Sequence, residues 1–123
     1  MRKLSFALMA LVLFSCSSKK AEVKQVTPED VVNSIFAAAK AKDYSGLSKL
    51  CDTDADSDSK KICDLQDKDK ASFEEYFSKG KIDGNATING SEAAVPILFG
   101  PDGTKSETMN LVQKDGKWYL KSF

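Results

Sequence analysis

The sequence of 123 residues contains no histidine. Histidine is the commonest general base and zinc ligand in proteins, because its unperturbed pKa lies close to neutral pH. Its absence excludes Ser-His-Asp and Cys-His catalysis and most zinc sites. No other motif supplies a catalytic pair, so we expect a protein that is not an enzyme and that carries no cofactor.

Arginine is almost as scarce, since Arg2 is the single example. The rest of the chain therefore lacks the guanidinium fork that binds phosphate and carboxylate groups in a bidentate manner. The whole sequence is formally neutral at pH 7, and loss of a leader containing Arg2 and Lys3 would make it slightly acidic. Such a chain is a poor candidate for nucleic-acid binding, and we expect no nucleic-acid partner.

Long apolar runs are also lacking. The longest, Phe6–Phe14, is too short to span a bilayer as a mature helix, and with the basic residues before it the run is typical of a secretory signal. It leads into Leu13-Phe14-Ser15-Cys16, which resembles the bacterial lipobox. We predict that residues 1–15 are a lipoprotein signal peptide and that Cys16 is lipidated, with palmitate among its acyl chains. The alternative is an ordinary secretory signal with an incidental cysteine.

A lipidated Cys16 would place the protein outside the cytoplasm, anchored to a bacterial membrane by its acyl chains. The next residue is Ser17 rather than aspartate, which by analogy favours the outer membrane, facing the periplasm. Residues 16–26 are polar and predict a tether. Residues 27–123 then form one small globular domain.

The first half of this domain has helical spacing. Thr27-Pro28-Glu29-Asp30 is a strong helix start, and a turn at residues 43–47 predicts a second short helix. Ala71–Lys79 predicts a third helix, ended by Gly80. The inward-facing residues of the second and third predicted helices are Tyr44, Leu47, Leu50, Cys51, Phe73, Tyr76 and Phe77.

The second half changes to the alternating pattern of strands. Four strands are expected, over residues 81–88, 91–99, 104–113 and 117–122, and Asn89-Gly90 is a strong hairpin signal between the first two. Pro96 implies an edge or a bulge in the second strand. We predict an α+β fold in which N-terminal helices pack on a curved four-stranded antiparallel sheet.

Two segments support a family resemblance. The helix start at residues 27–32 followed by Ala41-Lys42-Asp43-Tyr44-Ser45-Gly46-Leu47, and the closing Lys114-Asp115-Gly116-Lys117-Trp118, resemble nuclear transport factor 2-like domains. The chain is most similar to small bacterial lipoproteins with a domain of unknown function, allied to lumazine-binding-like domains. The resemblance implies a cone with a pocket between helices and sheet. It leaves function open, because one fold supports many activities.

The acidic stretch CDTDADSDSKKIC, residues 51–63, spaces four aspartates two residues apart: Asp52, Asp54, Asp56 and Asp58. An EF-hand loop needs glycine at position 6 and a bidentate glutamate at position 12. Counted from Asp52, these positions hold Ser57 and Cys63, so an EF-hand is excluded and we assign no metal site. A weak calcium site of another kind remains the alternative to a solvated loop with the aspartates facing water.

The same stretch contains two cysteines. Disulfides form outside the cytoplasm, and with Cys16 lipidated, Cys51 and Cys63 remain as a pair. A disulfide between them would close a ring worth about 3 kcal/mol. We favour this disulfide over the alternative, in which Cys51 is a small core residue and Cys63 is unpaired.

Three functions remain open. We favour a membrane-anchored, non-catalytic binding or interaction domain, whose exposed sheet face would meet another protein or a second copy. A first alternative is a carrier of a small apolar ligand, held by an aromatic lining of Phe36, Phe73, Phe77, Phe99 and Trp118. A second alternative, implied by the resemblance, is an isomerase or dehydratase using a pocket carboxylate and a tyrosine, with the candidates Asp83, Glu92, Tyr44, Tyr76 and Tyr119.

Overall fold

A computed structural model of the protein describes residues 24–123. The predicted signal peptide, Cys16 and most of the predicted tether lie outside the described residues. The described helices are α1 (Pro28–Ala41), α2 (Ser57–Cys63) and α3 (Lys70–Phe77), with the 3₁₀ turns η1 (Leu47–Lys49) and η2 (Asp67–Asp69). None of these helices has the length and apolar character needed to cross a membrane.

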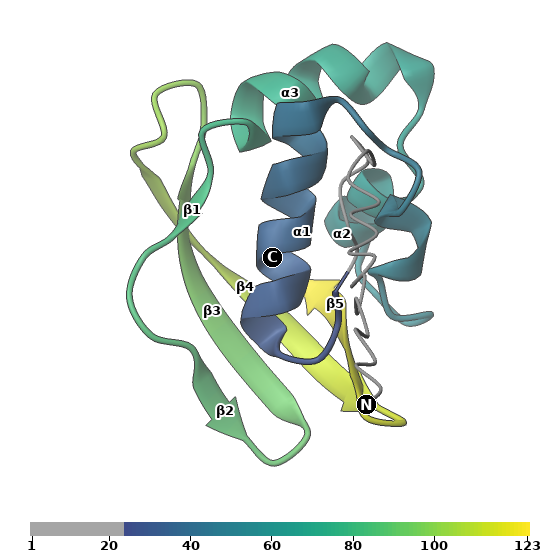
Figure 1. Ribbon diagram of the computed structural model, residues 1–123, viewed down its shortest axis with the longest axis vertical. Coiled ribbons are helices and arrows are strands. Elements are labelled where there is room, and N and C mark those ends of the chain that lie inside the picture. Colours follow the sequence, from purple (N-terminus) through teal and green to yellow (C-terminus); the bar gives the residue numbers. More distant parts are fainter. Residues whose placement is uncertain (1–23) are drawn as a thin grey trace, which may run out of the picture.

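Five strands follow the helices and confirm the α+β class: β1 (Lys81–Ile82), β2 (Thr87–Asn89), β3 (Glu92–Phe99), β4 (Lys105–Lys114) and β5 (Lys117–Ser122). They form one open antiparallel sheet in the order β1-β3-β4-β5, with β2 also paired to β3. In Figure 1, α1 lies across one face of this sheet, and the shorter α2 and α3 lie at its side and end.

The structure corrects the predicted number of strands. The segment expected to form one strand over residues 81–88 is divided into β1 and β2, which pair with opposite ends of β3. Gly84, between them, has a φ of +100° that a strand does not accommodate. Ile88 is 56% exposed, so the expected burial of alternate residues does not extend along β2.

Pro96 lies opposite this interruption. Its carbonyl accepts a hydrogen bond from the Asp83 N–H, at 2.8 Å, on the side of β1 and β2. The N–H and C=O of one residue in a strand point towards the same neighbouring strand. An N–H on residue 96 would therefore point into the break between β1 and β2, where the N–H that proline lacks is not needed for the sheet. The prediction of an edge or a bulge at Pro96 is therefore wrong, because β3 is a central strand whose pairing with β4 is continuous. The break between β1 and β2 accommodates the proline instead.

The predicted start of α1 is confirmed in detail. Thr27 Oγ1 accepts from the Asp30 N–H at 3.1 Å, and Asp30 Oδ2 accepts from the Thr27 N–H at 3.0 Å, which completes a capping box. The helix ends at Ala41, and the C-cap residue Lys42 has a left-handed φ of 53°. One face of α1 is buried against the sheet, through Val31, Val32, Ile35, Phe36 and Ala39.

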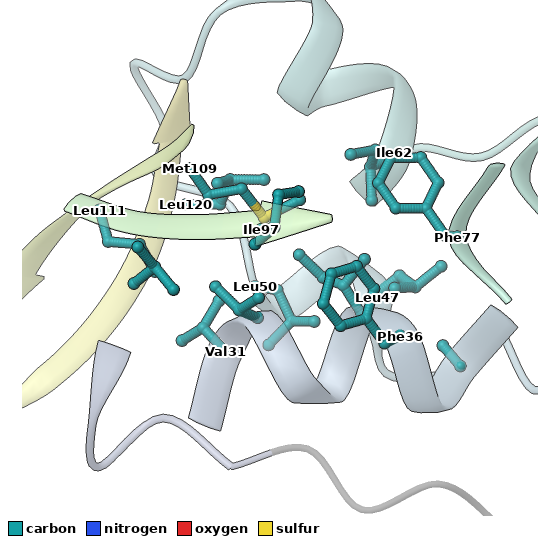
Figure 2. Close-up of a cluster of buried hydrophobic side chains, with 14 of the residues drawn as sticks. Val31, Phe36, Leu47, Leu50, Ile62, Phe77, Ile97, Met109, Leu111 and Leu120 are labelled. Atoms are coloured by element: carbon teal, nitrogen blue, oxygen red, sulfur yellow. The ribbon is translucent and has the colours of Figure 1, made fainter. Parts of the chain in front are cut away.

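A single hydrophobic core lies between α1 and the inner face of the sheet (Figure 2). Alternate residues of β3 point into it, which explains the alternating burial of that strand. The remaining core residues come from η1 and the residue after it, and from α2, α3, β4 and β5. The large side chains that are almost fully buried include Leu47, Leu50, Met109, Leu111 and Leu120.

Two expectations about the helical half are wrong. The second predicted helix is only the 3₁₀ turn η1, and Cys51 follows it in a parallel bridge to Leu120 of β5. The acidic stretch is not a loop throughout, since α2 occupies Ser57–Cys63. Just before α1, Gln25 Nε2 donates to the carbonyls of Lys49 and Trp118, both at 3.0 Å.

Gly80 provides a test of the packing between α1 and α3. A Cβ at this position would overlap the ring of Phe36, which is only 2% exposed and cannot move aside. We expect Gly80→Ala to lower the free energy of unfolding by about 3 kcal/mol, at the upper end of the usual cost of overpacking. Chemical denaturation followed by Trp118 fluorescence measures this loss.

Gly90→Ala is the matched control. Gly90 has a left-handed φ of +62°, but a Cβ added there would have no neighbouring atom within 4 Å, so only backbone strain of about 1 kcal/mol is expected. Equal stability of the two variants would contradict the close packing of Gly80 against the Phe36 ring.

Candidate functional site

The acidic stretch begins as an extra, irregular strand along the outer edge of β5. The Leu120 N–H donates to Leu50 O at 2.7 Å, and the Asp52 N–H donates to Leu120 O at 2.8 Å. Four residues later, the Asp56 N–H donates to Lys121 O at 2.9 Å. These bonds satisfy the edge of β5, which would otherwise present unpaired backbone groups.

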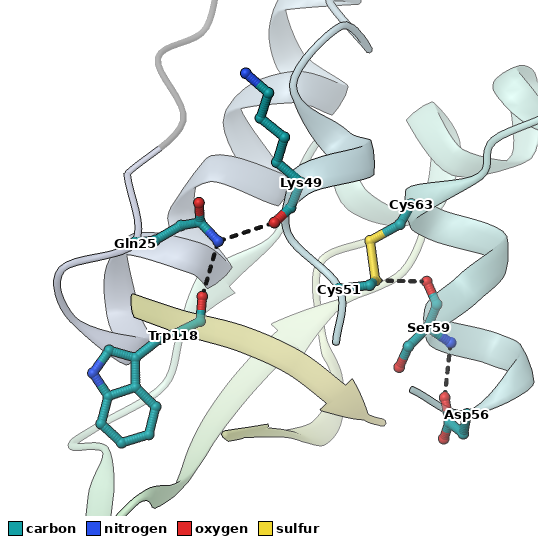
Figure 3. The surroundings of a disulfide bond; sticks show 7 residues. All are labelled: Gln25, Lys49, Cys51, Asp56, Ser59, Cys63 and Trp118. Atoms are coloured by element: carbon teal, nitrogen blue, oxygen red, sulfur yellow. Dashed lines mark hydrogen bonds between the residues drawn. A yellow bond between two sulfur atoms is a disulfide. The ribbon is translucent and has the colours of Figure 1, made fainter. Parts of the chain in front are cut away.

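A disulfide fixes the helix that follows (Figure 3). Cys51 and Cys63 are bonded to each other, with their Cα atoms 6.1 Å apart, which confirms the predicted pair. Asp56 caps the other end of α2, since its Oδ1 accepts from the Ser59 N–H at 2.8 Å. The two ends of this short helix are therefore both attached to the segment that runs along β5.

The four aspartates have separate surroundings. Asp52 is buried, and its Oδ1 lies 2.5 Å from Lys114 Nζ, so the prediction that the whole acidic run faces water is wrong. Asp56 is the helix cap, and Asp58 pairs with Lys61 at 3.6 Å on the surface, while Asp54 is exposed. Across residues 24–123, no group of three or more acidic, cysteine or histidine side chains is placed to hold a metal ion.

An apolar pocket lies between α2, α3 and the end of the sheet. Its volume is about 430 Å³, and the charged side chains of Asp58, Lys61 and Asp69 contribute to its lining. Its apolar lining consists of Ile62 and Leu65 from α2 and the segment after it, Phe73, Tyr76 and Phe77 from α3, Phe99 at the end of β3, and Phe123.

The aromatic rings of this pocket form one connected cluster around Phe77. The ring centroid of Phe77 lies 5.2 Å from Phe73, 5.4 Å from Phe99 and 5.8 Å from Phe123. Phe73 and Phe77 reach the pocket together because residues four apart share one face of a helix. The cluster gives the pocket a rigid wall, since aromatic side chains have few rotatable bonds.

Contacts behind the pocket hold α3 in place. The Tyr44 hydroxyl donates to Glu74, and the Tyr44 ring lies 6.1 Å from the Phe73 ring. Lys70 Nζ lies 5.0 Å from the centre of the Tyr44 ring, within range of a cation–π interaction. Tyr44 thus bonds to the same helix that supplies three of the pocket's aromatic rings.

Three of the five residues expected to line a pocket do so: Phe73, Phe77 and Phe99. Phe36 is buried in the core, stacked 6.3 Å from Phe77, and Trp118 is buried in β5 outside the lining. Ile62, Leu65 and Phe123 also line the pocket and were not predicted to do so. Recognition of α2 as a helix would have indicated Ile62, because it is the buried apolar residue of that helix.

The carboxylates considered for catalysis lie elsewhere. Asp83 and Glu92 are exposed and do not line the aromatic pocket. Of the candidate tyrosines, Tyr76 lines it, Tyr44 is bonded to Glu74 behind it, and Tyr119 belongs to β5. Neither candidate carboxylate therefore shares the aromatic pocket with a candidate tyrosine.

Comparison with known proteins gives a likeness of fold. No family model and no curated protein matches the chain. A solved structure, that of a SEC-C motif containing protein from Rhodopseudomonas palustris, matches with a TM-score of 0.52 at 23% sequence identity, covering 78% of this chain and 76% of that one. The predicted identification with nuclear transport factor 2-like domains and their lumazine-binding-like lipoproteins is wrong. No comparison matches that superfamily, and the solved structure that does match is a SEC-C motif containing protein.

The buried Asp52 makes stability depend on pH. Its hydrogen bond with Lys114 holds the pKa of the Asp52 carboxyl below its ordinary value. The carboxylate therefore stabilises the fold fully above the unfolded-state pKa of about 3.9, and this contribution is lost as pH falls through the lower folded-state pKa. We expect Asp52→Asn to cost about 1–3 kcal/mol at neutral pH and progressively less below about pH 4.

Urea denaturation at several pH values measures this difference. Asp102→Asn is the control, because Asp102 is exposed in the turn between β3 and β4 and its loss should leave the profile unchanged. A stability gap between wild type and Asp52→Asn that stays constant into the acid range would contradict the role given to the Asp52–Lys114 pair.

Proposed function

We propose that this protein is a lipid-anchored, extracytoplasmic bacterial binding protein, which takes a small apolar ligand in the aromatic pocket and catalyses no reaction. The observation that carries the proposal is the pocket itself, with five aromatic side chains and two aliphatic ones around about 430 Å³. Small-molecule sites are typically concave, mostly apolar and about 300–1,000 Å³ in volume.

The polar groups of the pocket suit binding better than proton transfer. Asp58 is 63% exposed at its side chain and already paired with Lys61. A general acid or base must lie within hydrogen-bond reach of the proton that it transfers. The Asp58 carboxylate is instead exposed and engaged by Lys61, and this favours the carrier over an isomerase or dehydratase.

The membrane anchor is supported by the sequence around Cys16. An extended chain spans at most about 3.6 Å per residue, so the segment from Cys16 to Lys24 would keep the domain within roughly 30 Å of the membrane surface. The Cys51–Cys63 disulfide agrees with an oxidising compartment outside the cytoplasm. We place the protein at the outer membrane, facing the periplasm.

Fluorescence titration with N-phenyl-1-naphthylamine tests the pocket, using the mature chain made unlipidated by Cys16→Ser. Ser72 is exposed and lines the pocket, so Ser72→Trp should fill it and weaken probe binding by at least about tenfold, or 1.4 kcal/mol. Ser48→Trp is the matched control, because Ser48 is an exposed serine in η1 away from the pocket. Equal affinity of both variants, or no probe binding by the wild type, would refute the ligand site.

Metabolic labelling with palmitate tests the anchor. We expect the wild-type chain to incorporate the label and to fractionate with the outer membrane, and Cys16→Ser to lose both properties. Cys51→Ser should keep the label, since that cysteine is used in the disulfide. An unlabelled wild-type protein would favour the ordinary secretory signal, and a labelled one in the inner membrane would contradict the placement.

A further inference from the structure

We infer a second binding site, for a neutral saccharide, on the face of the sheet that points away from α1. This face carries a hollow of about 330 Å³, separate from the aromatic pocket. The side chains that matter for its chemistry come from four strands and are Thr87, Asn89, Glu92, Ala94, Asn110 and Ser122.

The strand register explains why the sheet is hollowed here. Thr87 pairs with Ala94, Ala94 with Asn110, and Asn110 with Ser122, so these residues form one row across β2, β3, β4 and β5. Side chains of paired residues lie on the same face of a sheet. The neighbours of Ala94 along β3, Ala93 and Val95, are buried in the core, which puts the row on the opposite face.

Ala94, near the centre of this row, has the shortest side chain in it. The Ala94 methyl group forms the floor, and longer hydrogen-bonding groups rise on both sides of it. The next row adds Asn89, paired with Glu92, at one end. Exposed sheet faces are usually covered by charged or long polar side chains, whereas these two rows hold short, mostly neutral groups that leave a concave surface.

The polar groups are positioned before any ligand arrives. Asn110 Nδ2 donates to Ser122 Oγ at 3.1 Å. This bond orients both side chains, and it leaves the Asn110 amide oxygen and the Ser122 hydroxyl hydrogen free to meet a ligand. The irregular pairing between Asn110 and Leu111 on β4 lies beside them and adds Lys121 of β5 to the lining.

The chemistry fits a polyhydroxylated, uncharged ligand. Amides, hydroxyls and a carboxylate can each donate to or accept from sugar hydroxyl groups. Glu92 and Lys121 contribute one charge of each sign to the lining, so the lining has no net charge that would select an anion or a cation. Tyr119 pairs with Val112, which in turn pairs with Glu92, so its half-buried ring lies on the same face but outside the lining of the hollow.

Titration calorimetry with maltotriose, cellotriose and the trimer of N-acetylglucosamine tests the site, using the mature chain made unlipidated by Cys16→Ser. We expect one of these neutral trisaccharides to bind with a dissociation constant of about 1 mM or lower. Asn110→Ala and Glu92→Gln should each weaken this binding at least about fivefold, and Asn85→Ala, in the exposed segment between β1 and β2, should not. Asn89→Ala serves in place of Asn110→Ala if the latter does not fold.

The saccharide site and the aromatic pocket can be tested independently, because they share no lining residue. Ser72→Trp should leave saccharide binding unchanged, and saturating N-phenyl-1-naphthylamine should not displace the sugar. Binding of none of the three trisaccharides, or binding that both hollow variants retain at full strength, would overturn the saccharide site. Either result would leave the apolar ligand proposal intact.

Discussion

The attachment of residues 50–56 to the edge of β5 is the constraint on which the rest of the candidate pocket depends. A helix of seven residues such as α2 is too short to be stable alone, because helix nucleation is costly. Its position is set by what lies at its ends: the Asp56 cap, whose own N–H is bonded to β5, and the disulfide from Cys63 back to Cys51. Ile62 and Leu65 form one wall of the pocket because this helix is held over the end of the sheet.

The same attachment explains the roles of the acidic residues. A carboxylate is buried only when it has a partner, because removing its hydration is costly. Asp52 has that partner in Lys114, at the end of β4, and the ion pair links the start of the acidic stretch to the sheet. Asp56 is used in a second way, as an acceptor at the positive end of α2. The aspartates thus contribute to folding individually rather than as a cluster.

The sequence predicts the elements whose signals are local. The helix start at Thr27 and the helical spacing of α1 were recognisable, as were the aromatic face of α3 and the strand that became β3. The helix α2 was not, since Asp and Ser disfavour helices and Ile62 is its single large buried residue. The Asp52–Lys114 pair joins residues that are 62 positions apart, and no local sequence pattern predicts a partner so distant in the chain. The pocket was only partly predictable for the same reason. The aromatic residues of α3 could be recognised in the sequence, whereas Phe123 reaches them only because β5 ends beside the pocket.

The mistaken family resemblance has a physical explanation in the motifs that suggested it. Asp115 and Gly116 have φ angles of 52° and 76°, and a two-residue hairpin with two positive φ angles selects Asp-Gly or Asn-Gly in any fold. The helix start at Thr27 is likewise a capping box, which recurs wherever a helix begins at the surface. Both motifs report local backbone geometry that unrelated α+β domains share. The paired cysteines and the ring cluster around Phe77 instead depend on contacts that the tertiary fold creates.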